Sequence, residues 1–87
     1  MDDKELLKKA LNTFGAEAQT LMMFEEMSEL QKELFKNARG KENTAAIAEE
    51  IADVQIVLAQ MIILHECAEQ VKKYRASKLK RLSKLLG

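Results

Sequence analysis

Two pairs of acidic residues stand at a spacing that suits metal binding by helices. Glu26 and Glu29 lie three positions apart in the motif EEMSE, and Glu50 and Asp53 lie three apart in the motif EIAD. Residues three apart share one face of an α-helix, so each pair presents two carboxylates together. Like charges at this spacing repel each other, and no lysine or arginine stands four positions from Glu26 or Glu50 to offset them. A bound cation would resolve the repulsion.

The two pairs lie at matching distances from a predicted turn at Gly40. Glu26 precedes Gly40 by 14 residues and Asp53 follows it by 13, while Glu29 precedes it by 11 and Glu50 follows it by 10. In an antiparallel hairpin turning near Gly40, these residues would face each other in the same order. We therefore expect four carboxylates to converge between two helices. Oxygen ligands favour hard ions, Mg²⁺ first and Mn²⁺ next. The plain alternative is two solvated glutamate-rich faces, because glutamate is common on helices.

The composition predicts an all-α protein with a single domain over residues 1–87. Leucine, alanine, glutamate and lysine supply 45 of the 87 residues, whereas valine, isoleucine and threonine supply 11 and proline is absent. This balance favours helices and argues against a β-sandwich or barrel. A chain this short buries a limited core alone, which favours an oligomer.

Hydrophobic periodicity places the helices along the chain. We expect a short N-terminal helix over Lys4–Leu11, a long helix from Ala16 to about Asn37, and a second long helix from about Ala45 to Leu64. A C-terminal helix follows a break near Glu66–Ala68 and runs to Leu86. Gly40 can adopt the left-handed conformation that ends a helix, and Thr44 is a suitable cap for the next one.

The segment Val54–Leu64 predicts a subunit interface. It is apolar nearly all round, and a helix of that kind is buried on every side. A chain of 87 residues has too little protein to cover it. We therefore expect a helical hairpin of the two long helices, with the N-terminal and C-terminal helices beside it, to be completed as a bundle in a homodimer or homotetramer.

Charge and cysteine content restrict the classes of partner. The stretch 17–53 holds nine acidic and four basic residues, and the stretch 70–87 holds seven basic residues and no acid. Only Tyr74 accompanies the basic tail as an aromatic, so we expect no nucleic-acid partner. No apolar run approaches the ~20 residues that span a bilayer. With Cys67 as the single cysteine, we predict a cytoplasmic protein with no membrane partner.

The paired motifs resemble those of a known family. EExxE followed by ExxD across a short helical hairpin is similar to the MazG-like, all-α nucleoside triphosphate pyrophosphohydrolases. Here the motifs are EEMSE (Glu25–Glu29) and EIAD (Glu50–Asp53), with 20 residues between them. The stretch FGAEAQTLMMFEEMSELQKEL resembles the helix that carries the family's first motif, and the likeness extends from about Phe14 to Leu82. The compact chain with its KLKRL tail resembles small stand-alone and phage-encoded members.

The resemblance implies Mg²⁺-dependent hydrolysis of a nucleoside triphosphate, usually a deoxynucleotide, to the monophosphate and pyrophosphate by a dimer or a dimer of dimers. By motif position it also implies a support or water-activating role for Glu25. Lys78 and Arg81 match basic residues that related chains often carry, and they are candidate phosphate contacts. Gln19 lies two turns before Glu26, where an amide could contact a nucleobase. By motif position the predicted metal ligands are Glu26, Glu29, Glu50 and Asp53. The alternative is a non-catalytic helical oligomerisation or regulatory module.

Overall fold

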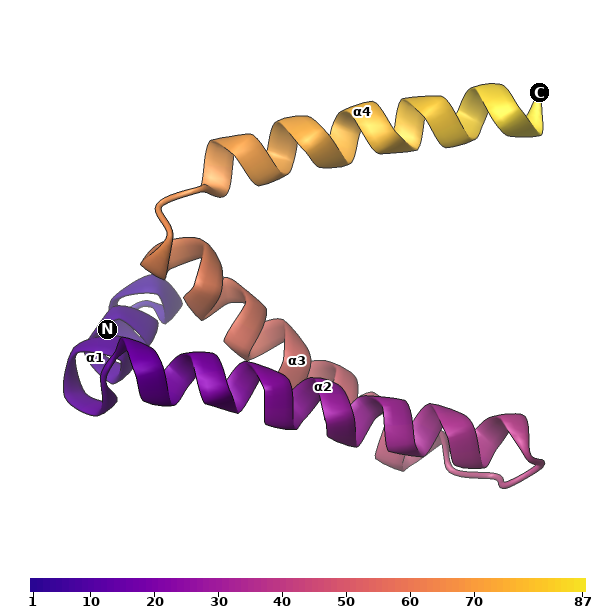
Figure 1. Ribbon diagram of the computed structural model, residues 1–87, viewed down its shortest axis with the longest axis horizontal. Coiled ribbons are helices and arrows are strands. Elements are labelled where there is room, and N and C mark those ends of the chain that lie inside the picture. Colours follow the sequence, from indigo (N-terminus) through magenta and orange to yellow (C-terminus); the bar gives the residue numbers. More distant parts are fainter.

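The computed structural model describes all 87 residues and contains four α-helices and no strand (Figure 1). They are α1 (Asp3–Phe14), α2 (Ala16–Ala38), α3 (Thr44–Leu64) and α4 (Ala68–Leu86). The predicted all-α class is therefore confirmed, as is the arrangement of two long helices flanked by a short N-terminal helix and a C-terminal helix.

The first helix is longer than the sequence pattern predicts. Asp2 is the cap residue before its first turn, and the Asp2 side chain accepts a hydrogen bond of 2.8 Å from the backbone N–H of Glu5. Gly15 ends it with φ of 94°, a conformation that glycine adopts without steric cost, and the Gly15 N–H donates to the carbonyl of Leu11. Asn12 and Thr13 lie beyond the predicted end at Leu11 and continue the helix, because the break occurs only at Gly15, which has positive φ.

The helices α2 and α3 form an antiparallel hairpin that turns at Gly40 (Figure 1). Gly40 has φ of 100°, as predicted for the residue that ends the first long helix. The predicted cap was wrong by one position. Thr44 is the first residue of α3 and Asn43 precedes it as the cap residue, with a side chain that makes no capping hydrogen bond to α3.

The core of the single chain is small. Only six residues are buried: Leu11, Met23 and Val57 are apolar, and Gln19, Asn43 and Gln60 are polar. One chain does not cover the apolar segment Val54–Leu64, as expected for so short a protein, because Ile56 and Leu58 are 53% and 46% exposed. Neither α3 nor any other helix combines the length and the apolarity needed to cross a bilayer.

The last helix stands away from the others (Figure 1). It contacts only α3, near the connection between them, and none of its residues is buried. The chain has a radius of gyration of 15.8 Å, against about 12 Å for a compact domain of this length. Its accessible surface is 7154 Å², against about 5,200 Å² for a folded monomer of this mass. The chain is therefore more open than a self-contained domain.

Candidate metal centre

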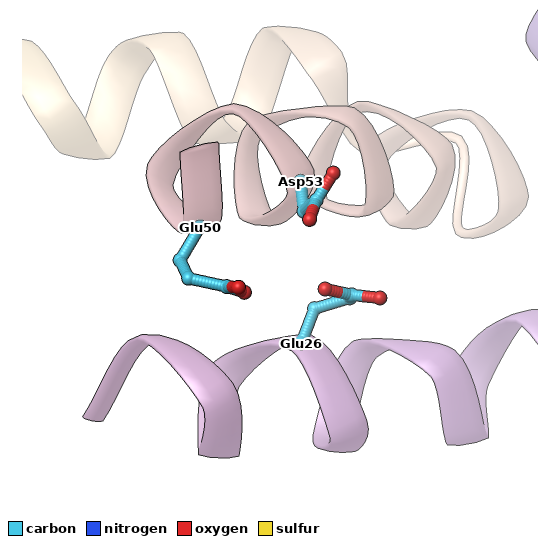
Figure 2. Close-up of side chains that lie close together, drawn as sticks. All are labelled: Glu26, Glu50 and Asp53. Atoms are coloured by element: carbon cyan, nitrogen blue, oxygen red, sulfur yellow. The ribbon is translucent and has the colours of Figure 1, made fainter. Parts of the chain in front are cut away.

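Three carboxylates meet across the α2–α3 hairpin. Glu26 comes from α2, while Glu50 and Asp53 come from α3, and their side chains point toward one another (Figure 2). One oxygen from each residue lies within 4.8 Å of those of the other two, and all three side chains are partly buried. The predicted register, in which Glu26 faces Asp53, is confirmed by this arrangement.

Glu29, the fourth predicted ligand, lies at the edge of this cluster. Its side chain is exposed, and its oxygens are outside the group that meets within 4.8 Å. It is nevertheless close enough for its charge to act on both Glu26 and Glu50. Glu25 is also exposed and its charge acts on Glu26. The structure thus forms a triad, defined as Glu26, Glu50 and Asp53, with two further acids beside it.

The triad is electrostatically unfavourable in the chain alone. Partial burial raises the pKa of Glu26, and the charges of Asp53, Glu25 and Glu29 raise it further. Burial also raises the pKa of Glu50, followed by the charges of Asp53 and Glu26. No basic side chain offsets this repulsion, because the only ion pair in the chain joins Lys36 to Glu33.

The donor set fits a hard divalent cation. The triad offers only carboxylate oxygens, which are the ligands that Mg²⁺ and Mn²⁺ prefer. One oxygen of Glu50, Oε2, is buried and has no hydrogen-bond partner. A buried carboxylate oxygen without a partner is costly, and coordination to a cation would satisfy it.

Two buried amides lie on the hairpin two helical turns from the triad. Gln19, predicted to contact substrate, precedes Glu26 by seven residues and is 7% exposed. Gln60 follows Asp53 by seven residues, is 4% exposed, and its Oε1 has no hydrogen-bond partner. Sequence reasoning missed Gln60, although an amide in an apolar stretch, seven residues after an acid, is a usable signal. Gln19 also lines a surface hollow of about 470 Å³ together with Phe14, Met22 and Glu25.

The predicted phosphate contacts do not reach the triad within one chain. Lys78 and Arg81 are exposed on α4, which contacts neither α1 nor α2. Neither residue forms an ion pair with any acid. These two residues could therefore act only at the triad of a second copy of the chain.

Comparisons with protein-family models, with curated proteins and with solved structures give no significant match to this chain. The motifs and the geometry of the triad are therefore the features of this chain that bear on its function.

Proposed function

We propose that this protein is a Mg²⁺-dependent nucleoside triphosphate pyrophosphohydrolase of the MazG-like kind, with Mn²⁺ as a possible substitute. The observation that carries the proposal is the meeting of Glu26, Glu50 and Asp53 across two helices without a basic partner. The unsatisfied Oε2 of Glu50 and the raised pKa values of Glu26 and Glu50 support a cation as the missing partner. The EEMSE and EIAD motifs support the choice of reaction.

The proposed reaction suits an acidic site. In it, a water oxygen bonds to the α-phosphorus, the bond from that phosphorus to the α,β-bridging oxygen breaks, and pyrophosphate leaves. Carboxylates repel a triphosphate, so they can serve the reaction only by holding Mg²⁺, which neutralises phosphate charge and favours attack by water. Glu26, Glu50 and Asp53 would hold the ion, with Glu29 near enough to join them.

Two groups of residues outside the triad are assigned supporting roles. Glu25 is an exposed acid next to the triad, and we assign it to orient the attacking water or accept its proton. Lys78 and Arg81 are assigned to bind phosphate oxygens, and Gln19 to contact the base. Because α4 lies apart from α2, the phosphate-binding role requires α4 of a second copy.

We propose that the functional form is a homodimer or homotetramer. The chain exposes about 2,000 Å² more than a folded monomer of its mass. Obligate homodimers bury roughly 1,000–2,500 Å² on each partner, so one second copy accounts for the excess. The exposed side chains of Ile56 and Leu58 on α3 and of Leu79 and Leu82 on α4 are the apolar surface available for it. The basic α4 also complements the acidic hairpin in charge.

The competing proposal is a helical oligomerisation or regulatory module without catalysis. The exposed apolar faces of α3 and α4 favour it, since assembly alone would account for them. It gives no reason for three carboxylates to be held together at the centre of the hairpin. The two proposals therefore differ in what they require of the triad.

A panel of NTPs and dNTPs with Mg²⁺, followed by ³¹P NMR, tests the proposed activity. We expect equal amounts of monophosphate and pyrophosphate from at least one nucleotide, and no turnover in EDTA. Glu17→Gln, an exposed acid on α2 away from the triad, is the matched control for Glu50→Gln and should leave turnover unchanged. Orthophosphate as the sole product, or turnover that persists in EDTA, would contradict the proposal.

A further inference from the structure

The turn of the hairpin contains a partly buried side-chain contact between Asn43, the residue before α3, and Glu33 on α2. The amide Nδ2 of Asn43 donates to the backbone carbonyl of Glu33 at 2.9 Å and to Glu33 Oε1 at 3.1 Å. The other Glu33 oxygen, Oε2, accepts from Lys36 Nζ at 3.0 Å. Both donors lower the pKa of Glu33, so the carboxylate stays charged. We call the Asn43–Glu33 contact the clamp.

The clamp is formed at the expense of other interactions of Asn43. Asn43 is the cap residue of α3, yet its side chain makes no capping hydrogen bond, although such a bond usually stabilises a helix. Its Oδ1 is buried without a partner, in a residue only 8% exposed. The side chain thus leaves its own helix uncapped and bonds α2 instead. This pattern indicates that the Asn43 side chain serves to connect α3 to α2 more than to cap α3.

Each residue of the clamp lies seven residues from a residue of the triad. Glu33 follows Glu26 by seven residues on α2, and Asn43 precedes Glu50 by seven at the start of α3. Seven residues are about two helical turns, so the clamp and the triad share one seam of the hairpin. Buried polar contacts in such seams fix the register of paired helices, as single buried asparagines do in coiled coils.

We propose that Asn43 and Glu33 are positioning residues that set the register of α2 against α3 and thereby hold Glu26 opposite Glu50 and Asp53. The triad carboxylates repel one another and no basic residue bridges them, so they do not hold this geometry themselves. The clamp supplies a directional contact two turns away. The expected effect of the clamp on metal affinity rests on the proposed function. Its expected effect on the register of the two helices does not.

The first test measures Mn²⁺ binding to the full chain by electron paramagnetic resonance at a temperature where every variant is folded. Asn43→Ser keeps a good cap residue but removes the amide that reaches Glu33, so the fold should persist. We expect Asn43→Ser to bind Mn²⁺ about tenfold more weakly, because a changed register moves Glu26 away from Glu50 and Asp53; this is the lower end of the cost of disturbing the groups that orient metal ligands. Asn37→Ala is the matched control, because Asn37 lies in the same turn and donates only to the Lys41 carbonyl on the surface. It should bind as the parent does.

The second test measures register without metal, using nitroxide labels at the exposed positions Gln31 on α2 and Ala48 on α3 in a Cys67→Ala background. We expect Asn43→Ser to shift or broaden the distance between the labels, and Asn37→Ala to leave it unchanged. Unchanged distances in Asn43→Ser would overturn the clamp proposal, whatever the metal result. A parent that binds no Mn²⁺, with the label distance altered in Asn43→Ser, would support the clamp and contradict the proposed function. Altered distances with unchanged Mn²⁺ affinity would overturn the link from the clamp to the triad.

Discussion

The α2–α3 hairpin and the helix α4 differ in burial and in charge. The hairpin contains every buried residue except Leu11, and it carries nine of the 14 acidic residues. Helix α4 contains no buried residue and carries seven of the 14 basic residues. Some hairpin side chains, such as Met23 and Val57, are buried within the chain although Ile56 and Leu58 stay exposed, whereas no apolar side chain of α4 is buried.

This contrast suggests that one chain forms the metal centre alone, whereas α4 needs a second copy to cover its apolar side chains. Most of the stability of a helix in a protein comes from packing of its apolar stripe, and no residue of α4 is buried in the single chain. The hairpin, in contrast, has an internal turn, a clamp and a seam of buried residues. We therefore expect changes in the hairpin to act on the metal centre and changes in α4 to act on assembly and on substrate binding.

The largest effect should come from the triad. Glu26→Gln, Glu50→Gln and Asp53→Asn each keep the side-chain shape and remove one charge from the cation site. We expect each to reduce turnover by more than the roughly 10–100-fold cost known for outer-shell partners. The measurement is the pyrophosphate assay with saturating Mg²⁺.

The same variants distinguish loss of the site from loss of the fold. Removing one charge relieves repulsion in the metal-free protein, so each variant should melt at or above the metal-free parent. Mg²⁺ should raise the melting temperature of the parent more than theirs, since a ligand stabilises only the state that binds it. Full activity together with a parental Mg²⁺ response in all three would leave the helical module as the better account.

The next largest effect should come from the apolar surface outside the core. Ile56→Glu on α3 and Leu82→Glu on α4 place a charge in the proposed interface, where an unpaired charge is costly. We expect both to shift the parent dimer or tetramer toward monomer in sedimentation equilibrium at micromolar concentration. Ser77→Glu adds the same charge to exposed α4 away from the stripe and should leave assembly intact. A parent that is already monomeric would contradict the oligomer proposal.

A moderate effect is expected from the basic residues of α4. Lys78→Ala and Arg81→Ala remove phosphate contacts, so KM should rise several-fold while the melting shift with Mg²⁺ stays parental. Lys72→Ala, on the same exposed helix, is the control and should alter neither quantity. If the Mg²⁺ shift falls together with substrate affinity, these residues act on the fold and the phosphate-binding role is wrong.

The sequence predicted the hairpin well because its determinants are local. Gly40 gives the left-handed turn, and the nearly equal spacing of Glu26 and Asp53 from it, 14 and 13 residues, is enough to set them face to face. The extent of α1 was harder to predict, because Asn12 and Thr13 are compatible with both helix and turn and Gly15 decides the break.

The parts of the site that escaped prediction depend on side-chain direction. Spacing alone places Glu29 opposite Glu50, but the Glu29 side chain is exposed and stays outside the triad. The clamp was missed because the sequence pattern placed the cap at Thr44, and no local pattern links Asn43 to Glu33, ten residues before it, as the structure does. The position of α4 could not be predicted, since nothing within the chain covers it.

The smallest expected effect concerns pH and stability without metal. The raised pKa of Glu50 means that the folded state binds this proton more tightly than the unfolded state. The metal-free parent should therefore become more stable as pH falls from neutrality toward the usual glutamate pKa. Glu33, whose pKa is lowered, acts in the opposite sense and loses its contribution only at lower pH. Glu50→Gln should gain less stability between pH 7 and pH 5 in EDTA, as measured by urea unfolding; an equal gain would contradict the assignment.

The most direct test of the metal centre is anomalous diffraction from crystals grown with Mn²⁺, recorded above and below the manganese absorption edge. We predict an anomalous peak bounded by Glu26, Glu50 and Asp53, with Glu29 turned toward it, and no peak there in Glu50→Gln crystals. Well-ordered triad side chains without a peak at saturating Mn²⁺, or a peak only elsewhere on the chain, would contradict the central claim that the hairpin holds a divalent cation.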